Sequence, residues 1–399
     1  MLNDLTLLRQ PILDAQMTII GYELIMQPIA SSGQVAMDCF MQLHQTHNLT
    51  ELAGGALIFL RANQLQLTEN LLNLIPNPNH LIIEVEASVA QEPETLKLLK
   101  SLRQGGVRLC LSDYQANSAD HDRVASACQY VKVNLDNCSG QNYRDVIEKL
   151  HKASLKVIAQ DVLDESCLHD LKASGFDYFQ GFFFTNPIVL HGKKLSASKL
   201  NLLHLLSKVN NNDTELDALS EIISHDVALS HKLLTAINQP QHNLPIKVTS
   251  ISDAIRYMGL KRLKLWISMI LMSEVDEKPQ ALMETSLVRA KLCELLAEHG
   301  GHKGEKDSYF LVGLFSTLGA YFDLPQDEVL DELPIAEHLK TAMLDYQGPV
   351  GQALWIAKQF ENPYADLMSL TYEDAAIMDL SNHYLAAARW GSMVMRDTQ

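Results

Sequence analysis

Short apolar segments alternate with helical patterns along the first half of the chain, and this alternation constrains the fold more than any other feature. Most of these β-rich segments are separated by a stretch whose apolar residues recur at helical spacing. The segments are 5–13, 18–26, 57–62, 80–87, 107–114, 129–136, 155–162 and 178–184. Strands that alternate with helices form parallel sheets, and five or more such units favour a closed barrel. We therefore predict an α/β domain, most simply a TIM-type barrel.

Three of these segments carry an acidic residue at or next to an apolar strand. Glu23 lies in IIGYELIMQP, Glu84 in LIIEVEA and Asp113 in VRLCLSDY. A buried carboxylate is unfavourable unless a partner or ligand binds it. Because the acidic groups recur across the strand–helix pattern, we expect them to line a common site at one end of the barrel or sheet.

The second half of the chain contains helical patterns and no convincing strand. The polar stretch HGKKLSAS at 191–198 marks the boundary, so we predict a barrel domain over 1–192 and an all-helical domain over 193–399. A leucine stripe in 193–208 predicts a linking helix that packs either on the barrel or within the helical domain. The run LWISMILM at 265–272 is hydrophobic on all sides, which is typical of a helix in a domain centre or at an interface.

Composition argues against several classes of protein. No charge-free apolar run approaches the length of about 20 residues that a transmembrane helix needs, and the N-terminus does not have the pattern of a signal peptide. The six cysteines are scattered without a CxxC pair, which fits reduced thiols in the cytoplasm better than disulfides or a zinc site. The net charge of -16 opposes non-specific binding to nucleic acid or to an anionic membrane.

The first half also resembles a known family. IIGYELIMQP, LIIEVEA, LCLSDYQ, YVKVNLD, VIAQDV and YFQGFFFTNP are similar, in order and spacing, to motifs of EAL-type cyclic di-GMP phosphodiesterases. The resemblance extends over about residues 5–190. It implies a (β/α)8-like barrel in which two divalent cations, at the carboxyl ends of the strands, assist hydrolysis of a cyclic dinucleotide.

Five residues match positions of the EAL site. Glu23 stands at the glutamate of the EAL motif, Glu84 at the second metal-binding glutamate and Asp113 at the second aspartate of a paired-aspartate motif. Lys132 matches the lysine that contacts the attacking water, and Gln180 matches a late glutamine. Without the resemblance, Asp113 fits a helix N-cap, Lys132 fits an ion-pair partner and Gln180 fits a residue that shapes the last strand.

Five further positions depart from the EAL pattern. Ser112 replaces the metal-bridging aspartate, Arg61 replaces an asparagine ligand and Gln160 replaces the glutamate of an AEGVE-like motif. Leu163 replaces the second glutamate of that motif, and Gln27 replaces an arginine that would hold substrate phosphate. The resemblance therefore implies vestigial site residues, with no catalytic residue and no bound metal expected.

The physical chemistry of these departures is unfavourable for metal binding. Ser112 lacks the negative charge of an aspartate bridge, and Arg61 places a fixed positive charge where a cation would lie. We hypothesise that the Arg61 guanidinium takes the place of the metal and forms a buried ion pair with Glu23 or Glu84.

The helical half resembles the HDOD domain. The similarity covers HDVALSHKLLTAINQP (225–240), VTSISDAIRYMGLKRLKLW (248–266) and YFLVGLFSTLGAYF (309–322). Ser316 and Thr317 stand where HD phosphohydrolases carry a histidine–aspartate pair, and neither is an adequate ligand for a divalent metal. HDOD domains are linked to signalling and regulation, without a fixed reaction.

Together these observations predict a cytoplasmic, bacterial-type signalling protein that regulates by protein–protein contact through its HDOD domain, with an inactive EAL barrel. One alternative is a receptor that binds cyclic di-GMP without cleaving it. Another is a weak phosphodiesterase, for which alone Mg²⁺ or Mn²⁺ would be needed. No nucleic-acid partner and no membrane insertion are expected, and a homodimer is left open.

Overall fold

The computed structural model divides the chain into two compact units. The first comprises Met1–Phe184 with Phe360–Ser369, and the second comprises Thr185–Gln359 with Leu370–Gln399. The described residues are 5–28, 53–61, 80–88, 93–135, 143–162, 164–186, 197–211, 231, 234–235, 237–238, 248–250, 253–254, 259–273, 275 and 278–397. Every helix in these ranges is too short or too polar to serve as a membrane span.

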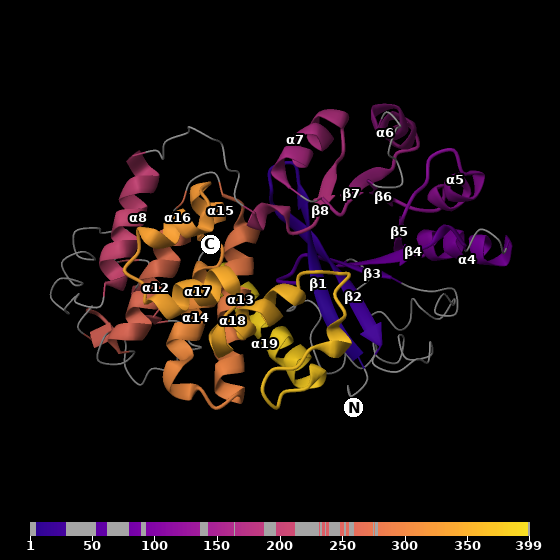
Figure 1. Ribbon diagram of the computed structural model, residues 1–399. Coiled ribbons are helices and arrows are strands. Elements are labelled where there is room, and N and C mark those ends of the chain that lie inside the picture. Colours follow the sequence, from indigo (N-terminus) through magenta and orange to yellow (C-terminus); the bar gives the residue numbers. More distant parts are fainter. Residues whose placement is uncertain are drawn as a thin grey trace. The chain divides into compact units, whose positions relative to one another are not determined.

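The first unit is built on a closed barrel whose strands follow their order in the sequence (Figure 1). The strands are β1 (Leu5–Asp14), β2 (Ile19–Pro28), β3 (Leu57–Arg61), β4 (Leu81–Val85), β5 (Arg108–Leu111), β6 (Tyr130–Asn134), β7 (Lys156–Gln160) and β8 (Tyr178–Gln180). Neighbouring strands from β2 to β8 are parallel, whereas β1 is antiparallel to both β2 and β8. The predicted barrel is therefore confirmed, except that its first strand does not follow the parallel pattern.

The antiparallel entry follows from a short turn between β1 and β2, since a parallel return would need a longer crossover. The Asp14 carboxylate orders this turn by accepting the backbone N–H groups of Gln16 and Thr18, each at 2.9 Å. The resulting register places Gln10 of β1 opposite Glu23 of β2. The hairpin therefore brings a second polar side chain beside the glutamate.

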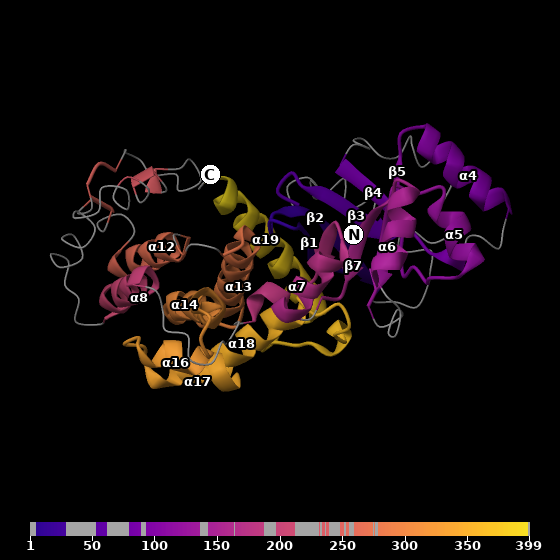
Figure 2. The same ribbon diagram turned by 90° about the horizontal axis from the view of Figure 1, so that it is seen from above.

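Helices connect the later strands and lie outside them (Figure 2). They are α4 (Pro93–Gln104), α5 (Ala119–Ala125), α6 (Tyr143–Lys152) and α7 (Glu165–Ser174), followed after β8 by the short η5 (Phe183–Thr185). At the start of α7, Asp164 accepts the N–H of Cys167 at 2.8 Å, and Gly175 ends the helix with a φ of 99°. The segments 34–48 and 66–76, in which helical apolar spacing predicts two further helices, lie outside the described residues.

The second unit is helical in its described residues. Its elements are α8 (Ala197–Asn210), α12 (Leu260–Ser273), α13 (Gln280–His299), η7 (Lys303–Glu305), α14 (Lys306–Phe315), α15 (Leu318–Phe322), α16 (Gln326–Asp331), α17 (Glu337–Asp345), α18 (Gly348–Gln359) and α19 (Ile377–Asp397). The remaining short helix, η8 (Leu367–Ser369), belongs to the barrel unit. The all-helical prediction is confirmed for these residues.

The long helix α13 forms the centre of the second unit, where it packs against α14, α18 and α19. Gly313 permits the close approach of α14, because a Cβ at this position would lie 2.6 Å from the backbone of Ala290. The stretch 265–272 in α12 is buried throughout, as its composition predicts. Helix α8, which contains most of the leucine stripe, packs against α12.

Candidate functional site

Polar side chains meet inside the barrel, toward the carboxyl ends of its strands. Glu84 is the fourth residue of β4, while Gln160 and Gln180 are the last residues of β7 and β8. Glu23 on β2 and Lys132 on β6 complete this group, and all five side chains are buried. The strand order thus gathers residues that are far apart in the sequence, as expected for a barrel.

Lys132 joins the two glutamates directly. Its Nζ donates a hydrogen bond to Glu23 Oε2 at 2.6 Å and a second, short hydrogen bond to Glu84 Oε1. The Lys132 side chain has no exposed surface. A buried ammonium shared by two carboxylates is a charge-assisted arrangement that compensates part of the desolvation of all three groups.

Two glutamine side chains extend this network around Glu23. The amide of Gln180 donates from Nε2 to Glu23 Oε2 at 2.5 Å and to Gln10 Oε1 at 2.7 Å. Gln10 is buried and is not among the site residues predicted from the sequence. The signal in the sequence is a polar residue within the apolar segment 5–13, and the hairpin register of the structure then places it directly opposite Glu23.

The two glutamates differ in their protonation. Burial opposes ionisation of Glu23, but the charges of Lys132 and Arg61 outweigh burial and hold the pKa of Glu23 below its ordinary value. Burial and the charge of Glu23 raise the pKa of Glu84 to about 7. Burial also opposes the charge on Lys132, yet the two glutamates raise the pKa of Lys132. Near neutral pH the site holds one ammonium, one ionised Glu23 and a partly protonated Glu84.

The hypothesis from the sequence places Arg61 as a buried cation in the position of the metal, and the structure places it differently. Its Nη2 lies 3.7 Å from Glu23 Oε1, and 43% of its side chain is exposed. Lys132 makes the shorter contacts and is the buried cation. The reason is geometric, because Arg61 ends β3 at the rim whereas Lys132 lies in the middle of β6.

Two aspartates that follow β5 and β7 have left-handed backbone conformations, which were not predicted from the sequence. Asp113 has a φ of 50° and does not cap a helix, since α5 begins later with Ser118 as its N-cap. Asp161, directly after Gln160, has a φ of 56°. Aspartate is among the few residues that tolerate this left-handed region.

Asp161 has a partner from a distant part of the sequence. The Tyr364 hydroxyl donates to Asp161 Oδ2 at 2.5 Å, and Tyr364 belongs to the segment Phe360–Ser369 of the barrel unit. Burial raises the pKa of Asp161, although the hydrogen bond from Tyr364 acts in the opposite direction. No local pattern in the sequence connects these two residues.

The residues present do not fit the pair of divalent cations that the EAL resemblance implies. Such cations need a dense set of oxygen ligands that includes carboxylates. Ser112 Oγ instead donates to the Val85 carbonyl oxygen at 3.2 Å, and Gln160 is neutral. In the part of the chain that the structure describes, no three His, Cys, Asp or Glu side chains converge to hold a metal ion.

The other predicted positions fall outside this network. Gln27 is in β2, where its backbone pairs with Thr6, while its side chain and all of Leu163 lie outside the described residues. Ser316 and Thr317 separate α14 from α15: Ser316 Oγ donates to the Gly313 carbonyl at 2.7 Å, and Thr317 shares a 2.6 Å hydrogen bond with Ser286. These hydrogen bonds are structural and belong to the break between α14 and α15.

Two family models match separate parts of the chain. The EAL domain model matches residues 57–187, and the HDOD domain model matches residues 199–329. The order of the two matches confirms the resemblances read from the sequence.

Two relatives match along almost the whole chain. The uncharacterised protein YuxH of Bacillus subtilis is 26% identical over 397 residues, which cover 96% of this chain and 97% of the relative. A Vibrio cholerae protein named cyclic di-GMP phosphodiesterase CdgJ is 24% identical over 407 residues, which cover 97% of this chain and 92% of the relative.

Solved EAL structures are also similar. The EAL domain of FimX from Pseudomonas aeruginosa, bound to cyclic di-GMP, is 17% identical with a TM-score of 0.37, and covers 46% of this chain and 90% of that chain. Bacillus subtilis YkuI, in complex with cyclic di-GMP and calcium, is 15% identical with a TM-score of 0.37, and covers 56% of this chain and 73% of that chain.

Proposed function

We propose, from the match to an EAL domain followed by an HDOD domain, that this signalling protein regulates by binding a protein partner through its helical unit. Its barrel does not hydrolyse cyclic di-GMP. The observation that carries the second statement is the Lys132 ammonium, which donates to both Glu23 and Glu84.

The charge of the barrel site supports the absence of hydrolysis. A divalent cation bound by Glu23 and Glu84 would lie close to the buried Lys132 ammonium and to the guanidinium of Arg61, 3.7 Å from Glu23. Repulsion between such charges reaches several kcal/mol at the reduced dielectric of a protein interior, about 4 kcal/mol per unit-charge pair at 4 Å. Ser112 and Gln160 supply no negative charge to offset it.

Hydrolysis is the competing function, and the name of the Vibrio cholerae relative favours it. The test incubates the full-length protein with cyclic di-GMP and either Mn²⁺ or Mg²⁺, and separates the products by chromatography. CdgJ serves as the active control and Glu23→Ala as the matched inactive variant. We expect no linear dinucleotide from this protein. Product that forms with the wild type and disappears in Glu23→Ala would overturn the proposal.

Binding without cleavage requires a separate measurement. Titration calorimetry with cyclic di-GMP, with and without Mg²⁺, should give no heat of binding if the barrel has lost both activities. Saturable heat without product would instead support the receptor alternative.

The partner surface is tested by cross-linking and mass spectrometry with the full-length protein in its native cells. We expect cross-links to a partner to concentrate in Thr185–Gln359 and Leu370–Gln399. Cross-links confined to the barrel unit would contradict a role of the helical unit in binding.

A further inference from the structure

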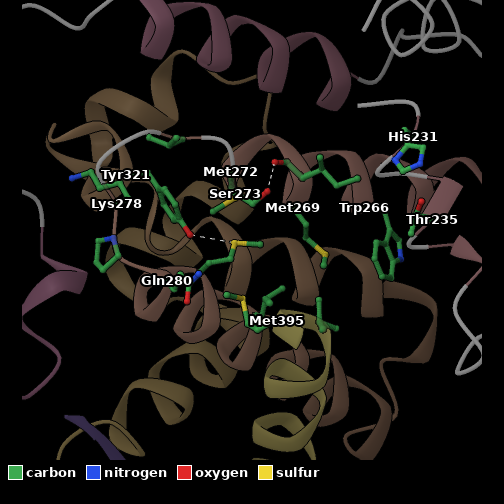
Figure 3. Close-up of a pocket in the computed structure, with 16 residues that line it drawn as sticks. His231, Thr235, Trp266, Met269, Met272, Ser273, Lys278, Gln280, Tyr321 and Met395 are labelled. Atoms are coloured by element: carbon green, nitrogen blue, oxygen red, sulfur yellow. Dashed lines mark hydrogen bonds between the residues drawn. The ribbon is translucent and has the colours of Figure 1, made fainter. Parts of the chain in front are cut away.

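The helical unit contains a cavity of about 430 Å³ that the proposed function does not use (Figure 3). Side chains from α12, α13, α15 and the last turns of α19 surround it, and most are apolar. Four methionines line its walls, at 269, 272, 283 and 395, together with Trp266 and Tyr321. The volume lies within the range of small-molecule sites, about 300–1,000 Å³.

The lining combines adaptable and rigid groups. Methionine side chains are flexible and polarizable, so they adjust to ligands of different outline, and they make favourable contacts with aromatic rings. Trp266 adds a flat apolar wall at one side of the cavity (Figure 3). Ser273 and Gln280 are exposed and line the same cavity, which therefore reaches the solvent beside these two residues.

The charged groups of the lining lie at its edge, where Lys278 and Lys199 share one carboxylate and leave one net positive charge. Lys278 Nζ donates to Asp323 Oδ1 at 2.5 Å, and the other oxygen of Asp323 accepts a hydrogen bond from Lys199 at 2.7 Å. Apart from tyrosine, the remaining ionisable group among the described lining residues is His231, which is exposed. An ionic ligand would lose its hydration in the apolar part of the cavity without a matching charge. The apolar part of the lining, between the methionines and Trp266, therefore favours an uncharged ligand.

Tyr321 supplies a directional polar group. Its hydroxyl is buried and donates to Met283 Sδ at 3.3 Å, as the dashed line in Figure 3 marks. Burial raises the pKa of Tyr321, although a hydrogen bond with Ser286 acts in the opposite direction, and the phenol retains its proton. A thioether is a weak acceptor, and a carbonyl or ether oxygen in the cavity would be a better one.

We propose that this cavity binds a small, uncharged, mostly apolar molecule that carries one carbonyl or ether oxygen, which accepts a hydrogen bond from Tyr321. The apolar body of the ligand contacts the methionines and Trp266. The cavity lies in the helical unit, so the proposal holds whether or not the barrel binds or cleaves a nucleotide.

The test uses two fluorescent probes that differ in one group. Prodan is a neutral naphthalene with a dimethylamino group and a propionyl carbonyl, and 2-dimethylaminonaphthalene has the same rings and amine without the carbonyl. Emission of prodan should shift to shorter wavelength and saturate when the full-length protein is added. Tyr321→Phe removes one hydrogen bond and should therefore weaken the binding of prodan about three- to tenfold. The affinity for the second probe should be unchanged.

A blocking variant locates the probes. Ser273→Trp places a large side chain at an exposed position of the opening and should abolish binding of both probes, whereas Gln352→Trp, at an exposed position of α18, should not. The proposal is overturned if prodan does not bind, if Ser273→Trp leaves binding intact, or if Tyr321→Phe affects the two probes alike. Circular dichroism verifies that each variant is folded.

Discussion

Replacing Glu84 with glutamine tests the protonation of the barrel site. Burial and the charge of Glu23 raise the pKa of Glu84 from its ordinary value of 4.5 to about 7. The folded protein therefore binds a proton that the unfolded chain has already released between these pH values, and stability falls as the pH rises from 4.5 through 7. The difference corresponds to about 3 kcal/mol. Glutamine resembles the protonated acid in shape and removes this loss.

We expect Glu84→Gln to be about 3 kcal/mol more stable than the wild type at pH 8, and less than about 1 kcal/mol more stable at pH 5. Two features of the site support the comparison. Lys132 keeps Glu23 as its charged partner in the variant, and the glutamine oxygen can accept the hydrogen bond that Glu84 Oε1 accepts. The second carboxylate oxygen, Glu84 Oε2, has no hydrogen-bond partner among the described residues, which makes its ionised form costly.

The assay must report on the barrel alone. Hydrogen exchange with mass spectrometry, on peptides covering Arg108–Leu111 and Tyr130–Asn134, meets this need after correction for the pH dependence of intrinsic exchange. Protection of these peptides in the variant should exceed that of the wild type about a hundredfold at pH 8. A peptide from α13 serves as the internal control and should be unchanged. An equal difference at pH 5 and pH 8 would refute the assigned protonation.

Two further substitutions test the charge network and the packing of the helical unit. Lys132→Met removes the buried ammonium and should lower the stability of the barrel by about 3–5 kcal/mol at pH 8. Lys149→Met, which breaks a half-exposed ion pair, should lower it by at most about 1 kcal/mol. The same exchange assay measures both variants, and equal losses of stability would contradict the network. Gly313→Ala should lower the stability of the helical unit by about 1–3 kcal/mol, because its Cβ would lie 2.6 Å from the Ala290 backbone. Gly304→Ala places its Cβ in open space and should change the stability by less than about 0.5 kcal/mol. Urea unfolding followed by tryptophan fluorescence reports on the helical unit, and a tolerated Gly313→Ala would refute the close contact.

The sequence by itself determined the two architectures. Repeated alternation of strand and helix patterns leads to a barrel because each pattern commits a run of residues to one kind of backbone hydrogen bonding. The period of each pattern is visible in the sequence without knowledge of tertiary contacts. The same order also determined that Glu23 and Glu84 meet, since parallel strands in a barrel end at one rim. Even the antiparallel β1 was implicit in the short turn after Asp14.

Tertiary structure alone decided which cation lies between those glutamates. Arg61 and Lys132 are both plausible partners in the sequence, but only the position of each residue along its strand places Lys132 inside and Arg61 at the rim. The contact of Tyr364 with Asp161, 203 residues apart, was likewise beyond any local pattern. Charge partners and pKa values depend on distance and burial in three dimensions, which periodicity along the chain does not encode.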